Sequence, residues 1–178
     1  MEFKKELNDM NTIDAILSRK SVRNFSSQEI EEEKINLLLK AAMAAPSAVN
    51  KQPWKFVVAK KKDKKEEIKS VMRFGKYDSP IIIIPCVKET STIPTMHDLA
   101  YCDLGAATEN ILLAAHELGL GAVWCAIYPN KKHIKQIRKI LDLGALTSPF
   151  AAIYVGYPSD DDKSKVRDKF DEKNIVTI

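Results

Sequence analysis

The sequence predicts a layered α/β or α+β domain, because runs typical of buried strands alternate along it with runs typical of amphipathic helices. Two observations carry most of this prediction. Residues 81–87 form an apolar run of strand length, and residues 99–118 place apolar residues at helical spacing over a much longer stretch. The 178 residues fit one compact core, so residues 1–178 are interpreted as a single domain.

Three short elements are predicted in the first half of the chain. Residues 12–18 predict a helix with Asn11 or Thr12 as its N-cap. Residues 55–59 have the β-branched and aromatic character of a strand, and residues 63–71 predict a short, charged helix after it.

A longer amphipathic helix is expected between these segments. Ser26 or Ser27 is predicted to cap it, because Glu29 follows Ser26 at the spacing of a capping box. Pro46 is expected to end it. One buried face is marked by apolar residues at helical spacing: Ile35, Leu38, Leu39 and Ala42.

The second half of the chain repeats the alternation. The helix at residues 99–118 is rich in glycine and alanine, which predicts a place in the middle of the molecule or of a dimer. A strand at 122–128, a helix at 130–141 and a strand at 150–155 follow. The charged tail closes with the apolar residues 175–178, which are expected to add an edge strand, on a partner subunit, since an apolar end is useful only when it docks.

Composition and charge exclude several classes of function. The formal charge of +4 comes largely from the lysine-rich residues 60–65. No aromatic residues interleave with these lysines to stack bases, so no nucleic-acid partner is expected. No secretory signal and no apolar run of membrane-spanning length occur, so a cytoplasmic protein without a membrane partner is expected. Cys86, Cys102 and Cys125 have no recurrent spacing, which predicts buried thiols in a reducing compartment and no metal site.

Two polar segments are the candidate functional sites. The loop at residues 45–54 holds Ser47, Asn50 and Gln52 between two prolines, and such a loop could meet a flat ligand with a polar edge or simply connect a helix to a strand. Around Ser21, three basic residues without acidic neighbours suit a phosphate group. A basic helix C-terminus would also explain part of that cluster.

The common catalytic motifs are absent. The sequence has no Gly-x-Gly-x-x-Gly after a strand, no Walker-type Gly-Lys-Ser/Thr loop and no Gly-x-Ser-x-Gly elbow. These motifs therefore identify no catalytic side chain.

Four segments in order resemble the nitroreductase family of FMN-dependent oxidoreductases: residues 18–25, 45–54, 117–124 and 150–158. The resemblance extends over about residues 12–170. It implies an α+β fold with a central mixed β-sheet flanked by helices. It also implies a homodimer in which the C-terminal tail docks on the partner and FMN lies at the subunit interface.

The resemblance also assigns the cofactor contacts. Residues 19–23 match the family's first phosphate- and flavin-binding segment, residues 46–52 match the loop that reaches the isoalloxazine from the second subunit, and Ala126 stands where many members have glycine. The last phosphate contact is placed among Lys165, Arg167 and Lys169. The implied set is Arg19, Lys20, Ser21, Arg23, Pro46, Ser47, Ala48, Asn50, Gln52, Cys125, Ala126, Arg167 and Lys169.

The implied activity is hydride transfer from NADH or NADPH through FMN to a small electron-poor acceptor, such as a nitroaromatic or a quinone, by a ping-pong mechanism. Three alternatives remain open at this point. They are a non-catalytic flavin-binding protein, a relative specialised for one substrate, such as a dehalogenase or a flavin-cannibalising enzyme, and an α/β domain without a cofactor. The chain is short for the family, which predicts an open cleft.

Overall fold

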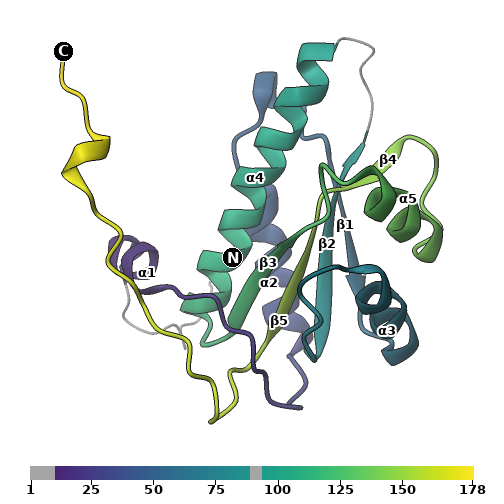
Figure 1. Ribbon diagram of the computed structural model, residues 1–178, viewed down its shortest axis with the longest axis horizontal. Coiled ribbons are helices and arrows are strands. Elements are labelled where there is room, and N and C mark those ends of the chain that lie inside the picture. Colours follow the sequence, from purple (N-terminus) through teal and green to yellow (C-terminus); the bar gives the residue numbers. More distant parts are fainter. Residues whose placement is uncertain (1–10, 89–93) are drawn as a thin grey trace.

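The computed structural model describes residues 11–88 and 94–178. Strands and helices alternate along the chain, and the helices lie on both faces of one sheet (Figure 1). The helices are α1 (Thr12–Ser18), α2 (Glu32–Met43), α3 (Lys62–Val71), α4 (Pro94–Glu117) and α5 (Lys131–Ile140), with the short 3₁₀ helices η1 (Ala48–Asn50) and η2 (Glu172–Asn174). The strands are β1 (Trp54–Ala59), β2 (Ile81–Lys88), β3 (Gly121–Ala126), β4 (Thr147–Pro149) and β5 (Ala151–Gly156).

The sheet has the order β1-β2-β5-β3, with β4 paired to β2 beside this path. All pairs of these strands are antiparallel. Parallel pairing enters at the β3 edge through the single bridge between Ser21 and Ala122. The predicted α+β fold with a helix-flanked sheet is confirmed, whereas the named strands form an antiparallel sheet where a mixed one was expected.

Strand β2 lies at the centre because its apolar run can fill both faces of the sheet. Ile83 points into the cluster beneath α2 and α4, while Ile82 and Ile84 point into the cluster beneath α3 and α5. All three are fully buried, and each such side chain contributes about 1.5–3 kcal/mol through burial. Successive side chains alternate between the faces of a strand, so one run of isoleucines supports both cores.

Helix α4 packs closely on α2, as its small residues predict. Ala107 and Ala115 are completely buried in the cluster between the two helices. The side-chain amide of Asn110 donates to the backbone oxygen of Ala41, 2.9 Å away, and ties α4 to the end of α2. Helix α4 is thereby held in place, and it also contacts α1 and η1.

The capping prediction for α2 is wrong. The helix begins at Glu32, and Ser26 instead accepts a hydrogen bond from the backbone of Gln28 in a local turn. The backbone N–H of Ser26 donates to Tyr157 O, 2.9 Å away, and Phe25 bridges to Pro158. Pairing with the end of β5 keeps these residues extended, and a local capping pattern does not reveal such a distant partner.

The remaining elements agree with the sequence in part. Asn11 is the N-cap of α1, as predicted, and accepts from the backbone of Asp14. The long helix α4 begins at Pro94, so it shortens the loop expected at 90–95, part of which lies outside the described residues. Strand β4 has three residues and includes a proline, too short for a periodic signal. Cys102 is exposed, so the prediction of buried thiols fails at this position.

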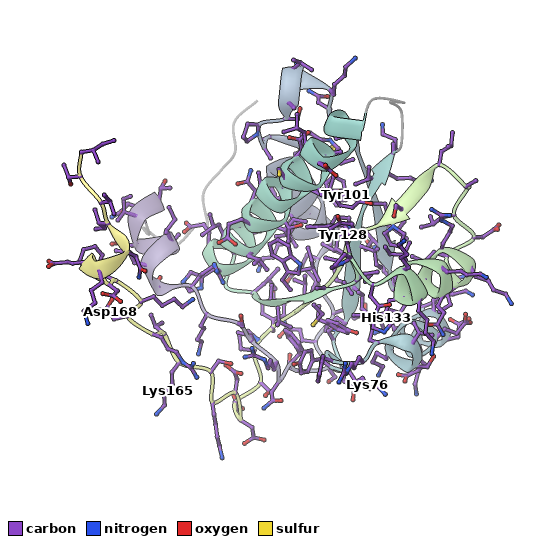
Figure 2. The ribbon with its side chains drawn as sticks, turned by 45° about the horizontal axis from the view of Figure 1, so that its top comes forward. Lys76, Tyr101, Tyr128, His133, Lys165 and Asp168 are labelled. Carbon is purple, nitrogen blue, oxygen red and sulfur yellow. The ribbon has the colours of Figure 1, made fainter. Side chains whose placement is uncertain are left out.

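The C-terminal tail leaves the sheet after β5 and runs beside α1 (Figures 1 and 2). Residues 165–178 are exposed, and the only regular element among them is η2. Within this single chain the apolar end forms no strand, and its docking on a partner stays a prediction.

Candidate cofactor site

The segment that follows α1 lies along the outer edge of β3. The backbone N–H of Val22 donates to Ala122 O, 3.1 Å away, beside the bridge between Ser21 and Ala122. Gly121 permits this close approach, because a Cβ atom there would meet the Cβ of Val22 at 2.5 Å. The edge of the sheet thus fixes the backbone of residues 21–22 and the polar residues around them.

The C-terminal tail crosses the same segment. Lys20 Nζ donates to Ser164 O at 2.8 Å, and the hydroxyl of Ser164 donates to Ser21 O at 2.8 Å. Lys20 Nζ also lies 3.3 Å from Oδ2 of Asp162, whose side chain is 5% exposed. Burial alone would raise the pKa of Asp162, but hydrogen bonds from Ser164 and Lys20 lower it below its usual value. The ammonium group of Lys20 therefore holds the tail at Ser164 and Asp162, and the backbone of Lys20 stays beside the edge of β3.

This crossing joins the two predicted basic segments. Residues 19–23 and the start of 163–169 lie together although more than a hundred positions separate them in the sequence. Lys165 follows the crossing directly, and Figure 2 shows it on the tail together with Asp168. Arg167 and Lys169, the predicted last contacts, are exposed on the same tail. The meeting of these cationic segments suits a phosphate group.

Arg19 is oriented by an acidic residue of α4. Its Nε donates to Glu109 Oε1 at 2.7 Å, and the two side chains are 24% and 41% exposed. Because one carboxylate oxygen takes Nε, the terminal nitrogens of the planar guanidinium remain for a second anion. Arg23 is exposed and donates to Ser21 O at 3.2 Å. Both arginines are thus placed at the start of the β3 edge.

Backbone alternation determines which residues of β3 face outward. The carbonyl of Ala122 points away from β5, since it accepts from Val22. Polar backbone groups of a strand point to alternate sides, so Trp124 and Ala126 present theirs to the same outer side. Cys125 directs its backbone toward its partner Ala152 in β5. Of the two predicted residues, Ala126 therefore offers an outward backbone amide.

The side chain of Cys125 packs against the apolar cluster beneath α3 and α5. A Cβ atom at Gly75 would meet its sulfur at 2.2 Å, and Gly75 has the positive φ of 77° that favours glycine. Burial raises the pKa of Cys125 to about 11 and that of Cys86 to about 12. A raised pKa favours the protonated thiol at neutral pH, which is the less nucleophilic form.

The loop with the other predicted residues lies elsewhere. Figure 1 shows η1, the short blue helix, beside the upper part of α4, while α1 contacts the lower end of α4. One chain therefore does not bring Pro46, Ser47, Ala48, Asn50 and Gln52 to the basic segments. The resemblance implies that they come from a second subunit, and the observed separation agrees with that arrangement.

The loop is held in an unusual conformation. Val49, Asn50 and Gln52 have positive φ angles of 45°, 54° and 49°. Each such residue costs roughly 1–3 kcal/mol and persists only when its surroundings fix it. The fixing contacts are local and distant: Gln52 N–H donates to Ser47 Oγ at 3.0 Å, and Ala48 N–H donates to Oδ1 of Asp103 in α4 at 3.0 Å. The loop is thus presented to the outside as a preformed surface.

Asp103 anchors this loop from a buried position, and we expect its replacement by alanine to weaken FMN binding. Its exposure is 8%, and it is the acceptor for Ala48. Loss of that acceptor leaves a strained loop untethered, at a cost of about 1–3 kcal/mol, or up to roughly a hundredfold in affinity. Quenching of FMN fluorescence measures the affinity. Asp103→Asn keeps an acceptor oxygen and should restore most of it; equal loss in both variants would contradict an anchoring role.

The donor set of the described residues fits FMN. Cationic groups from residues 19–23 and from the tail suit a phosphate of about two negative charges, and the outward amide of Ala126 suits the polar edge of a flavin ring. Sequence reasoning missed the residues that hold this set in place: Asp103, Glu109, Asp162 and Ser164. Their contacts join distant parts of the chain, and no local pattern marks them.

Two other kinds of site receive no support in the described ranges. No group of three or more histidines, cysteines or acidic residues within 11–88 and 94–178 is placed to hold a metal ion. No helix in these same ranges has the length and apolarity needed to cross a bilayer.

The fold and this arrangement define a class: an α+β protein whose cationic segments, beside the free edge of the sheet, suit an anionic cofactor. Residues 16–75 and 73–157 match the model of the Nitroreductase family, and the chain belongs to that family.

Related proteins cover almost the whole chain. A Methanothermobacter thermautotrophicus protein, provisionally named an NADH dehydrogenase/NAD(P)H nitroreductase, is 37% identical over 172 residues, covering 96% of this chain and 88% of its own. A crystal structure from Bacteroides thetaiotaomicron with the same provisional name has a TM-score of 0.87 and 35% identity over 96% and 98% of the chains. An FMN-dependent nitroreductase from Clostridium difficile has a TM-score of 0.82 and 28% identity over 93% and 98%.

Proposed function

We propose that this protein transfers hydride from NADH or NADPH through FMN to a small electron-poor acceptor, a nitroaromatic or a quinone, in a ping-pong reaction. Family membership places the chain among NAD(P)H-dependent flavin oxidoreductases with FMN as cofactor. The finer proposal concerns the acceptor class, the order of the steps and the residues that act.

One observation carries the assignment of the site. The tail crosses residues 20–21 through three contacts of Lys20 and Ser164, and so brings two basic segments to the edge of β3. Arg19, Arg23 and the cations of the tail would bind the phosphate there. The backbone amide of Ala126 would face the polar edge of the ring system.

When bound, FMN would supply the hydride-transfer chemistry. The chain would bind and orient the cofactor, and its sequence carries none of the common catalytic motifs. Glu109 orients the guanidinium of Arg19, and the clasp of Lys20 on Ser164 and Asp162 fixes the direction of the tail. Donor and acceptor would occupy the same cleft in turn.

A second copy of the chain completes the proposed site. The preformed loop at residues 46–52 faces outward at the other end of α4, where a partner's cofactor could meet it. Apolar side chains also remain uncovered on α1 and on the tail: Ile13, Ile16, Leu17, Val166, Phe170, Ile175, Val176 and Ile178. Exposed apolar groups at this density favour a protein interface. We infer a homodimer in which α1 and the tail contact the partner.

The test is an absorbance spectrum of the purified protein, followed by anaerobic addition of NADH and NADPH in turn. The expected result is a flavin spectrum that bleaches with one nucleotide and recovers with a nitroaromatic or a quinone. A flavin that stays oxidised with both nucleotides would favour the non-catalytic binding protein. Turnover with a single halogenated substrate and no general acceptor would favour a specialised relative, and protein without flavin after FMN is supplied would overturn the assignment.

A further inference from the structure

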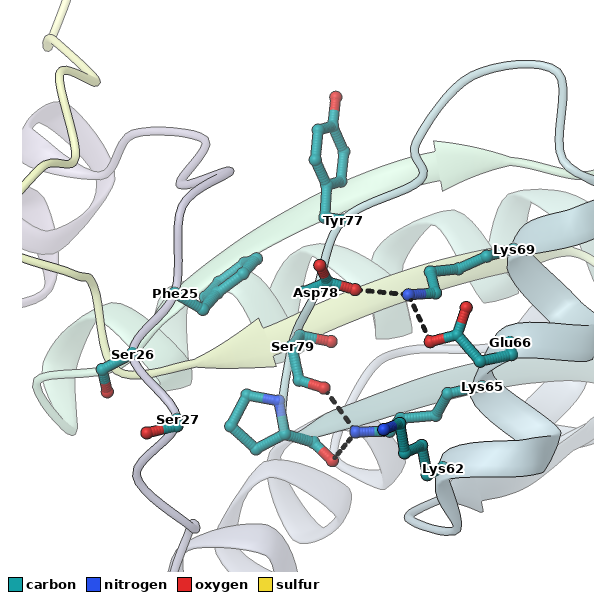
Figure 3. A pocket seen from close by; sticks show the side chains of 11 residues that line it. Phe25, Ser26, Ser27, Lys62, Lys65, Glu66, Lys69, Tyr77, Asp78 and Ser79 are labelled. Carbon is teal, nitrogen blue, oxygen red and sulfur yellow. Dashed lines mark hydrogen bonds and ion pairs between the residues drawn. The ribbon is translucent and has the colours of Figure 1, made fainter.

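A pocket lies on the face of the sheet that α4 does not cover. It has a volume of about 520 Å³, within the range of small-molecule sites, and is formed by residues 25–27, the inner side of α3 and residues 77–80 (Figure 3). Phe25 and Tyr77 pack against the apolar cluster beneath α3 and α5, whereas Arg19 contacts α4. None of the residues that line this pocket belongs to the candidate cofactor site.

The charges in this pocket leave a positive surplus. Lys62, Lys65 and Lys69 face it at helical spacing from α3. Lys69 alone pairs with both acidic residues of the pocket, Glu66 at 2.6 Å and Asp78. Three ammonium groups against two carboxylates leave one positive charge, which suits a ligand with a single negative charge.

Lys65 has no carboxylate at hydrogen-bond distance in the described part of the chain. Its ammonium donates to the carbonyls of Ser79 and Pro80 at 2.7 and 2.9 Å. Burial lowers the pKa of Lys65, and the neighbouring charge of Lys69 lowers it further. An anion bound next to Lys65 would stabilise its charged form against both burial and the charge of Lys69.

The rest of the lining suits an aromatic body. In Figure 3 the rings of Phe25 and Tyr77 lie at one end and the ammonium groups of Lys62 and Lys65 at the other. Tyr77 is fixed by an edge-on contact with Tyr154, with ring centroids 5.5 Å apart. Ser26 and Ser27 line the wall opposite α3.

We propose that this pocket binds a small aromatic carboxylate, with the carboxylate between Lys62 and Lys65 and the ring against Phe25 and Tyr77. The single surplus charge favours a monoanion over a phosphate, and the aromatic end favours a flat apolar body. This binding site is independent of hydride transfer and does not rest on the proposed function.

The test measures the binding of 4-fluorobenzoate to the FMN-saturated protein by the broadening of its ¹⁹F NMR line. The parent is expected to bind it in the millimolar range. Lys62→Glu should weaken binding roughly tenfold or more, because it reverses the charge nearest the anion. Lys62 is exposed in the first turn of α3, where a glutamate favours the helix dipole, so this variant is expected to fold.

Lys61→Glu is the matched control. It makes the same charge change one residue away, outside the pocket, and should leave the affinity within about twofold of the parent. The uncharged analogue 4-fluorobenzyl alcohol should bind far more weakly. Equal loss in both variants, equal binding of the alcohol, no binding by the parent, or broadening that follows a change in flavin absorbance would each overturn the proposal.

Discussion

Replacement of Arg19 by alanine is expected to weaken FMN retention by about 1.5–3 kcal/mol, or on the order of ten- to a hundredfold in Kd. The guanidinium would donate charged hydrogen bonds to the phosphate. Its loss also leaves Glu109, now 2.7 Å from Arg19 Nε, without that partner close to the bound anion. Equilibrium dialysis or fluorescence quenching measures the change.

Two further variants sharpen this test. The double substitution Arg19→Ala/Glu109→Ala should recover part of the lost affinity, because it removes the repulsive carboxylate. Arg73→Ala is the matched control, since this guanidinium lies 5.1 Å from the ring centroid of Phe74 and outside the site. Equal FMN affinity in the parent and Arg19→Ala would mean that this arginine does not contact the phosphate.

Deletion of Asn174–Ile178 is expected to dissociate the proposed homodimer. Ile175, Val176 and Ile178 are 57%, 83% and 115% exposed in the single chain. Burial of such side chains stabilises an interface by about 1.5–3 kcal/mol each, so their joint loss should raise the dimer Kd by roughly three orders of magnitude or more. Sedimentation over a concentration series measures the change. FMN retention should fall as well, because a monomer lacks the partner's loop.

The control for the deletion is Lys173→Ala, which changes an exposed residue of η2 and keeps the apolar end. This variant should sediment as the parent does. If the deleted protein also remains dimeric at low micromolar concentration, the tail does not dock on the partner. A monomeric deletion variant that retains FMN would support docking of the tail on the partner. It would also show that the partner's loop at residues 46–52 is dispensable for FMN binding.

Local patterns were enough for most of the fold. The apolar run at residues 81–87 predicted β2, and the asparagine before α1 predicted its cap. Both signals depend on neighbours within a turn of helix or a few residues of strand. Where a distant partner competes, such patterns fail: Ser26 pairs its backbone with Tyr157 and does not cap α2.

The site divides in the same way. The sequence alone determined the types of residue that an FMN site needs, because charge and hydrogen-bonding capacity belong to each side chain wherever it lies. The tertiary structure decided their tasks: Lys20 holds the tail through Ser164, and Asp103 holds Ala48. The register of β3 against β5 directs the backbone of Ala126 outward and that of Cys125 toward Ala152. The physical reason is that periodic burial is a local property of the chain, whereas a hydrogen-bond partner is chosen only when distant segments meet.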